Sequence, residues 1–121
     1  GVMPTQQRMI IARILFNRDQ HLSADQVMKR VNEGRSHVSK ATVYNTLGLF
    51  ARKGLVREVI VDPTRVFYDS NTSEHHHFYN VDSGELIDIG SDSLAVDSLA
   101  SLPEGTVVED IDVIIRVRNA F

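Results

Sequence analysis

Residues 39–69 read SKATVYNTLGLFARKGLVREVIVDPTRVFYD, and in this stretch a helical pattern gives way to a strand pattern. Ser39 is a candidate helix N-cap, and Gly54 supplies the helix stop. The apolar side chains between them repeat at the spacing of one helical face and are Val43, Leu47 and Phe50. After Gly54, two runs rich in β-branched and aromatic residues flank the turn sequence Asp-Pro-Thr. The stretch therefore predicts a helix followed directly by a β-hairpin.

Two amphipathic segments precede this stretch. Residues 5–17 carry apolar side chains at helical spacing. A second helix is predicted from Ser23, a candidate N-cap, to about Gly34, with His21 at its start. Three helices followed by a two-stranded hairpin describe a winged helix-turn-helix. The sequence thus predicts an N-terminal winged-helix DNA-binding domain in residues 1–70.

The second half of the chain has a different pattern. The runs HHFYNV and ELIDIG flank the turn Asp-Ser-Gly and predict another hairpin. A short helix is predicted at residues 91–100, and the alternation in VVEDIDVIIRVR predicts a strand over residues 107–118. We therefore expect a small α/β dimerisation and ligand-sensing domain in residues 74–121, and an α+β fold class overall.

The charges divide between these two halves. Residues 1–57 hold ten Lys and Arg residues against three acidic ones, a net charge of +7. Residues 58–121 hold three Arg residues against thirteen acidic ones, a net charge of −10. This asymmetry suggests a polyanion-binding module joined to an acidic domain, whereas chance clustering on solvated faces is the alternative.

Composition also excludes several classes of site. The chain has no cysteine, so disulfides, thiolate metal sites and a structural zinc site built from cysteines are excluded. No apolar run approaches the roughly 20 residues of a membrane span, so we expect no membrane partner. With no cysteine and no visible signal peptide, we expect a cytoplasmic location.

The third predicted helix is the expected recognition helix of a double-stranded DNA operator. Its N-terminal half holds the side chains that would contact base edges, which are Ser39, Lys40, Thr42, Tyr44 and Asn45. Arg8 and Arg57 are expected to contact phosphates and to add affinity without sequence information. The alternative is an amphipathic helix that packs against the core and does not contact DNA.

The run SEHHHFYN is a candidate metal or cofactor site. Side chains alternate along a strand, so His75 and His77 share one face while His76 points the other way. Two imidazoles at this spacing can share Fe(II), Mn(II) or Zn(II), or they can ligate haem iron axially. The other candidate metal donors are His21, Asp69 and Asp88. The plain alternative is a solvated run of three histidines.

Several stretches together resemble the ferric uptake regulator (Fur) superfamily over residues 3–118. These are PTQQRMII, HLSADQV, SKATVYNTL, RVFYD and HHHFYNVDSGELIDI. Within it, the HHH run, GELIDI and the PEG…IDVIIRVR ending resemble the iron response regulator (Irr) branch. The resemblance implies a dimeric or larger transcription regulator that is active under iron limitation. It would control genes for haem synthesis and for iron uptake and storage.

The resemblance also assigns residues. It implies that Tyr44 is the tyrosine of the recognition helix. The regulatory metal site, for Fe(II) or Mn(II), would fall on His21, Asp69, His75, His77 and Asp88. Haem would bind the group formed by His75, His76 and His77. The basic residue that the superfamily can carry ahead of Pro4 is absent, so either an N-terminal segment is missing or that minor-groove contact is not made.

Two alternatives remain open at this point. The peroxide-sensing branch also has an aspartate at the position of Asp88, so a peroxide-sensing or manganese-sensing repressor is the first. A metal-dependent enzyme or metal carrier is the second. The sequence offers no nucleophile with a partner base, and five ligands suggest a saturated sensing site rather than a catalytic one. We therefore expect that the protein is not an enzyme.

Overall fold

The structure is a computed structural model, and it describes residues 5–34, 37–73, 75–90 and 101–121. The chain divides into two compact units, an N-terminal unit Gly1–Ser73 and a C-terminal unit Glu74–Phe121. The first holds three helices and a small sheet, and the second holds a further sheet, which confirms the α+β class. Among the described residues, no helix is long and apolar enough to cross a membrane.

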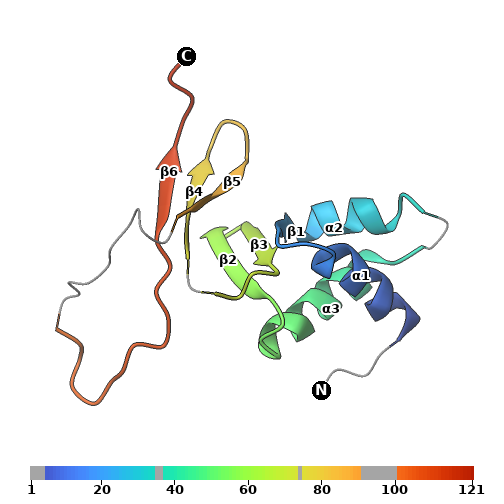
Figure 1. The fold of residues 1–121 in the computed structure, drawn as a ribbon, viewed down its shortest axis with the longest axis horizontal. Helices are drawn as coiled ribbons and strands as arrows, with labels where there is room; N and C mark the ends of the chain where they lie inside the picture. Colours follow the sequence, from blue (N-terminus) through green and yellow to red (C-terminus); the bar gives the residue numbers. More distant parts are fainter. Residues whose placement is uncertain (1–4, 35–36, 74, 91–100) are drawn as a thin grey trace. The chain divides into compact units, whose positions relative to one another are not determined.

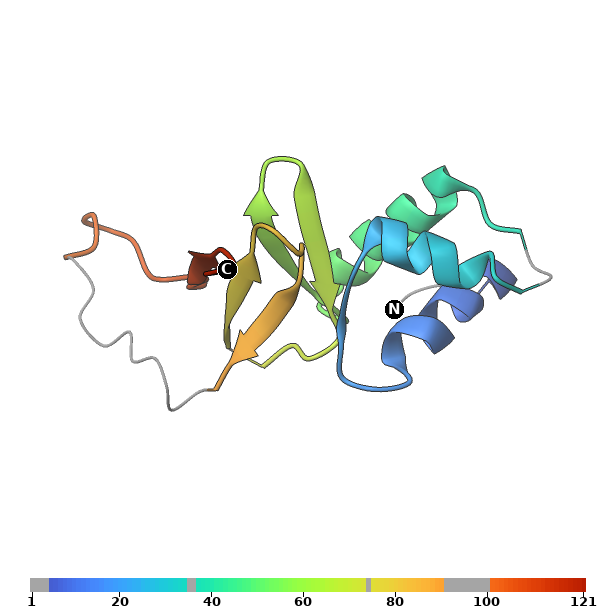
Figure 2. The same ribbon diagram turned by 90° about the horizontal axis from the view of Figure 1, so that it is seen from above.

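Three helices build most of the N-terminal unit, and they lie together beside its sheet (Figure 2). They are α1 (Gln6–Phe16), α2 (Ala24–Val31) and α3 (Lys40–Arg52). A polar side chain caps each N-terminus, namely Thr5, Ser23 and Ser39. The α2 cap is reciprocal, because the Ser23 hydroxyl accepts from the Gln26 N–H while the Gln26 side chain accepts from the Ser23 N–H. These caps explain why the helices begin where they do.

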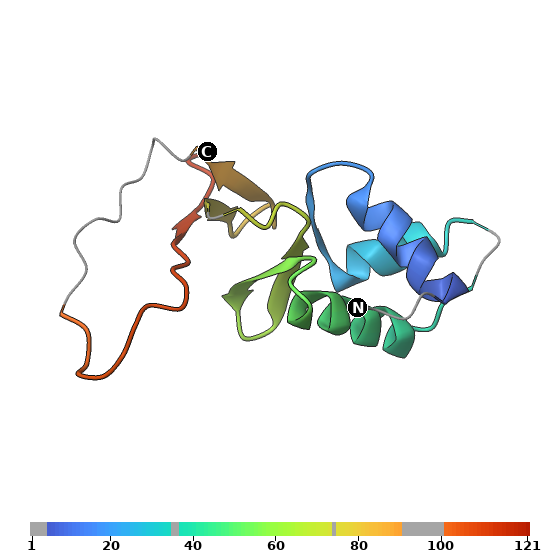
Figure 3. The same cartoon turned by 60° about the horizontal axis from the view of Figure 1, so that its bottom comes forward.

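The sheet of this unit has the order β1-β3-β2, with both pairs antiparallel. Its strands are β1 (His21–Ser23), β2 (Arg57–Asp62) and β3 (Arg65–Asp69). Gly54, with φ of +72°, lies between α3 and β2 and ends the helix. From the end of α3 the chain turns into the sheet (Figure 3). The Asp62 carboxylate closes the hairpin turn by accepting from the Thr64 N–H and hydroxyl, both at 2.8 Å. These bonds lower the pKa of the Asp62 carboxyl. The predicted wing hairpin is therefore confirmed.

Strand β1 was not predicted. The sequence predicts His21 at the start of the second helix, whereas in the structure His21 begins a strand that pairs with β3. A strand of three residues is too short to show alternation, and Ser23 both ends it and caps α2. The pairing partner, which lies more than forty residues later in the chain, decides this assignment.

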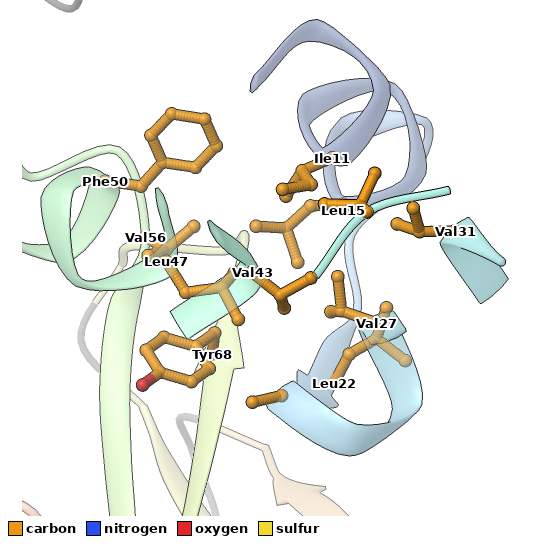
Figure 4. Packing of buried hydrophobic residues seen from close by; sticks show 12 residues of the cluster. Ile11, Leu15, Leu22, Val27, Val31, Val43, Leu47, Phe50, Val56 and Tyr68 are labelled. Atoms are coloured by element: carbon orange, nitrogen blue, oxygen red, sulfur yellow. The ribbon is translucent and has the colours of Figure 1, made fainter. Parts of the chain in front are cut away.

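The core of the N-terminal unit forms where the helices face the sheet, and the predicted stripe of Val43, Leu47 and Phe50 lies within it. The side chains labelled in Figure 4 converge on this core and are Ile11, Leu15, Leu22, Val27, Val31, Val43, Leu47, Phe50, Val56 and Tyr68. Burial raises the pKa of the Tyr68 hydroxyl. Because the core uses the apolar face of α3, its polar face is left to solvent.

Gln20 connects three parts of this unit just before β1. Its side-chain amide donates to the carbonyls of Ile14 at 2.7 Å and Leu15 at 3.2 Å, which lie near the end of α1. Its side-chain oxygen accepts from Arg30 of α2 at 3.1 Å. Its backbone N–H donates to the Ser70 hydroxyl at 3.0 Å, just beyond β3. Gln20 thereby fixes the position of β1.

Replacing Gln20 with alanine is expected to lower the free energy of unfolding by about 1–2 kcal/mol, because several part-buried groups lose a partner. Urea unfolding followed by circular dichroism measures this loss. Gln7→Ala, at an exposed position of α1, serves as the control and should change stability by less than about 0.5 kcal/mol. Equal stability of the two variants would contradict the role given to Gln20.

The C-terminal unit contains a sheet of order β5-β4-β6 (Figure 1). Its strands are β4 (His76–Asn80), β5 (Leu86–Ile89) and β6 (Ile114–Val117). β4 and β5 form the predicted antiparallel hairpin, and Gly84, with φ of +76°, lies in its turn. β6 runs parallel to β4 on the other side.

The strand predicted over residues 107–118 is mostly wrong, because only Ile114–Val117 pairs. Pairing with β4 begins at His77 and ends at Asn80, where β4 itself ends, so the ladder accommodates four residues. Alternation in the sequence cannot show how long the partner strand is. The helix predicted at residues 91–100 lies outside the described residues.

Candidate metal centre and nucleic-acid interface

Two histidines face each other on the central strand of the C-terminal unit. His75 directly precedes β4 and His77 lies within it, and their ring centroids are 4.6 Å apart. Both are buried, with exposed fractions of 8% and 0%. This proximity follows from strand alternation, which puts residues two apart on the same face.

Asp88 brings a carboxylate to this pair from the neighbouring strand. It is the register partner of His77, so its side chain lies on the same face of the sheet. One Asp88 carboxylate oxygen lies 3.2 Å from Nε2 of His77 and 3.5 Å from Nε2 of His75. Two donors each about 2.1 Å from one ion are at most about 4.2 Å apart, so both separations suit a shared ion. We call His75, His77 and Asp88 the histidine–aspartate cluster.

The chemistry of this cluster is that of a divalent-metal site. It offers two imidazole nitrogens and a carboxylate oxygen, and the ligand atoms of all three residues lie within 4.8 Å of one another. Such donors suit Fe(II), Mn(II) or Zn(II). Asp88 is 53% exposed, so an ion can reach the buried imidazoles from the side of this carboxylate.

His76 has a different role in the structure. Its Nδ1 accepts a hydrogen bond from the backbone N–H of Val113 at 3.1 Å, which ties the chain before β6 to β4. In a neutral imidazole that accepts at Nδ1, the proton sits on Nε2, and that nitrogen then has no lone pair for a metal. His76 therefore has a hydrogen-bond partner of its own, whereas His75 and His77 lie beside Asp88.

The other two predicted metal ligands lie in the N-terminal unit. His21 in β1 and Asp69 in β3 are register partners, so their side chains share a face of that sheet. Asp69 is 1% exposed and its carboxylate accepts from the Asn71 N–H at 2.9 Å. The His21 ring meets Phe67 edge-on, with centroids 6.2 Å apart. The sequence predicts both residues as metal ligands, but it does not predict β1, the strand that pairs His21 with Asp69.

The predicted base-reading residues lie along the exposed side of α3. Lys40, Tyr44 and Asn45 are exposed, and the Lys40 ammonium lies 5.7 Å from the centre of the Tyr44 ring. Ser39 is the helix cap, and its hydroxyl donates to the Thr42 hydroxyl at 2.9 Å. Ser39 and Thr42 therefore already have bonding partners within α3, whereas Tyr44 presents 43% of its surface to solvent.

A polar pocket of about 240 Å³ joins the start of α1 to α3. Three of its lining residues, Arg8, Thr42 and Asn45, were predicted to contact DNA. The other three lining residues, which the sequence pattern does not indicate as DNA contacts, are Thr5, Gln7 and Thr46. The Thr5 cap marks the start of α1, where backbone N–H groups without helical acceptors favour an anion.

Arg57, the remaining predicted DNA contact, lies elsewhere. It begins β2, and its register partner on β3 is Asp69. Its side chain is partly buried.

The chain is similar to known proteins both in sequence and in fold. Residues 1–116 match the family described as "Ferric uptake regulator family". A peroxide-responsive repressor PerR of Staphylococcus aureus is 32% identical over 88 residues, which cover 73% of this chain and 60% of that protein. This chain thus spans less than two thirds of the length of that curated relative.

Solved structures show the same fold. The ferric uptake regulator of Francisella tularensis with iron aligns with a TM-score of 0.79 at 24% identity, over 99% of this chain and 93% of its own. The ferric uptake regulator of Pseudomonas aeruginosa with manganese aligns with a TM-score of 0.70 at 25% identity, over 100% of this chain and 92% of its own.

Proposed function

This chain belongs to the ferric uptake regulator family, and from that premise we propose that it is a cytoplasmic, metal-responsive transcription regulator that binds double-stranded DNA as a homodimer. Members of this family are transcription regulators rather than enzymes. The observation that carries the proposal is the histidine–aspartate cluster, in which two buried imidazoles and a carboxylate lie close enough to share an ion. Exposed polar residues on α3 support the DNA-binding part.

The proposed metal site combines residues of both units. The cluster of His75, His77 and Asp88 supplies three ligands, and His21 with Asp69 would supply the other two. Only residues 70–74 separate Asp69 from His75 in the chain. Six residue steps span at most about 20 Å, which limits how far apart Asp69 and His75 can lie. Nitrogen and carboxylate donors without a thiolate suit Fe(II) or Mn(II).

An ion held in this way would connect the DNA-binding unit to the C-terminal unit. It would supply positive charge that neutralises two carboxylates, while the protein's own residues set the geometry. Metal binding changes DNA affinity only by its differential affinity for the DNA-competent arrangement. The response is therefore a coupling between two sites, and DNA binding must change metal affinity by the same factor.

The DNA-binding part of the proposal uses two surfaces of the N-terminal unit. Tyr44 and Asn45 would contact base edges in the major groove, Tyr through thymine methyl groups and Asn through adenine. The pocket lined by Arg8 would receive a backbone phosphate, because a guanidinium and the start of α1 both favour an anion there.

Replacing Arg8 with glutamine is expected to weaken DNA binding about equally for all sequences, because one phosphate contact is lost. The slope of log affinity against log salt concentration should fall by about 1 in magnitude. Fluorescence anisotropy with labelled duplexes at several salt concentrations measures both quantities. Arg13→Gln, on an exposed part of the same helix, is the matched control, and an equal effect of the two changes would count against the pocket.

The dimer is proposed to form through the C-terminal unit. The register places Ile87, Phe78 and Ile115 in one row across its sheet, and Ile87 and Ile115 are 42% and 38% exposed. Such a row favours burial against another surface. Two recognition helices held in this way would read half-sites about one helical turn apart.

Two finer proposals concern the signal. Similarity to peroxide-responsive repressors, at 32% identity, supports a peroxide or manganese sensor that uses the five-ligand site. In the peroxide case, hydrogen peroxide would insert one of its oxygen atoms into a ring C–H bond of a ligand histidine in the Fe(II)-loaded protein, and the other oxygen would leave as water. Mass spectrometry of peptides containing His21 or His75 after peroxide treatment tests it, and peptides without added oxygen would exclude it.

The Irr-like proposal rests on the HHH run and its flanking motifs alone. In this proposal the protein regulates genes for haem synthesis and for iron uptake or storage when iron is scarce, and haem binds at His75–His77. A haem titration by absorbance beside a DNA-binding assay tests it, with the triple alanine variant at these histidines as control. Haem uptake that releases DNA only in the wild type would support haem sensing. Equal uptake by both proteins, or none, would remove it.

A further inference from the structure

Arg57 stands in an unexpected place for a residue that contacts DNA. On one side of Asp69, β1 places His21 at the same register position. On the other side, β2 places Arg57 there. The three residues therefore form one row across the β1-β3-β2 sheet, with Asp69 in the middle. We call them the Asp69 row.

Side chains in such a row are close neighbours. Residues directly opposite each other on antiparallel strands share a face, and their Cβ atoms are about 4.5–5.5 Å apart. The guanidinium of a partly buried Arg57 can therefore reach the carboxylate of Asp69 along this face. A role as a phosphate contact would instead need its side chain to extend away from this row.

The buried carboxylate explains why a cation belongs there. Asp69 is 1% exposed, and a buried carboxylate is costly unless a cation and hydrogen-bond donors compensate it. The Asn71 N–H provides one donor. Arg57 is the arginine of the row, and because a guanidinium is always charged, it is the permanent cation beside this carboxylate.

We propose that Arg57 is the internal counter-cation of Asp69, that it competes with the metal ion for this carboxylate, and that it thereby sets the metal concentration to which the protein responds. This inference rests on the proposed metal site and adds the residue that tunes it. Without metal, Arg57 balances the buried charge. With metal, a divalent cation takes over that balance, and Arg57 is repelled from the site.

The test is a Mn(II) titration by isothermal calorimetry on the full chain, for the wild type and Arg57→Gln. Removing the competing cation is expected to raise Mn(II) affinity about tenfold or more, since one charge within 4–6 Å shifts proton binding by a similar factor. Arg57→Lys keeps the charge and should stay near the wild type. Arg65→Gln removes a charge from an exposed position of the same sheet, and its Mn(II) affinity should also stay near that of the wild type.

A double-mutant cycle separates competition from general electrostatics. In an Asp69→Asn background, Arg57→Gln should no longer raise Mn(II) affinity, because the shared carboxylate is gone. Circular dichroism shows whether each variant is folded. If Arg57→Gln fails to fold, Arg57→Met, which also removes the charge but keeps a long apolar side chain, carries the test. Unchanged Mn(II) affinity in that variant would overturn competition.

The outcomes distinguish this inference from the function on which it rests. If the wild type binds no Mn(II), the proposed metal site fails and the inference fails with it. If the wild type binds Mn(II) and Arg57→Gln binds it equally, only the role of Arg57 is overturned. If Arg57→Gln instead weakens DNA binding and lowers its salt dependence at unchanged Mn(II) affinity, Arg57 is the phosphate contact that the sequence suggested.

Discussion

Replacing His77 with alanine is expected to lower Mn(II) affinity at least about 100-fold, more than the roughly 10–100-fold that follows from loss of an outer-shell partner. His77 is fully buried, and its Nε2 lies 3.2 Å from the Asp88 carboxylate, so its truncation removes a donor from the interior of the proposed site. Isothermal calorimetry measures the affinity. The metal dependence of DNA binding should disappear in the same variant, because both measurements report one site.

His76→Asn is the matched control for this prediction. It changes the adjacent histidine on the opposite face, and the asparagine oxygen can still accept from the Val113 N–H. Mn(II) affinity should stay within about threefold of the wild type, since His76 is no ligand in the proposed site. A loss as large as that of the His77 variant would show that all three histidines act together, and would restore the grouping first suggested for haem.

Replacing Leu47 with alanine is expected to lower the free energy of unfolding by about 2–5 kcal/mol, because it leaves a cavity in a packed core. Leu47 is fully buried where α3 meets α1, α2 and the sheet (Figure 4). Such a loss is a large fraction of the roughly 5–15 kcal/mol that stabilises a typical domain. Urea unfolding by circular dichroism measures it.

Leu55→Ala gives the comparison for this core prediction. Leu55 is 43% exposed just beyond Gly54, so its truncation removes less buried surface. We expect it to cost less than about 1 kcal/mol. Equal losses at Leu47 and Leu55 would mean that α3 does not dock through the stripe that Val43, Leu47 and Phe50 define.

The sequence predicted those parts of the fold whose determinants are local. Ser39 and Gly54 mark the ends of α3 by capping and by a positive φ, and the apolar stripe between them is the face that packs. Strand alternation likewise predicted that His75 and His77 share a face and that Asp88 faces them from the next strand. Each of these depends on residues within one element or one hairpin.

The features that the sequence could not show depend on long-range pairing. The three residues of β1 become a strand only because β3 lies beside them, and the same pairing puts His21 next to Asp69. The position of Arg57 beside Asp69 is a second consequence of register. The bond from Val113 to His76 joins residues 37 positions apart and gives one of three identical side chains a separate role.

The most direct test of the central claim is a selection from random-sequence duplex DNA with purified protein, carried out in parallel with Mn(II) and with a chelator. A metal-responsive regulator should enrich an inverted repeat whose half-sites lie about one helical turn apart, and enrichment should differ between the two conditions in the wild type but not in His77→Ala. Enrichment of no sequence under either condition would contradict the proposed function. An inverted repeat enriched equally with and without metal would keep the DNA-binding role and remove the metal response.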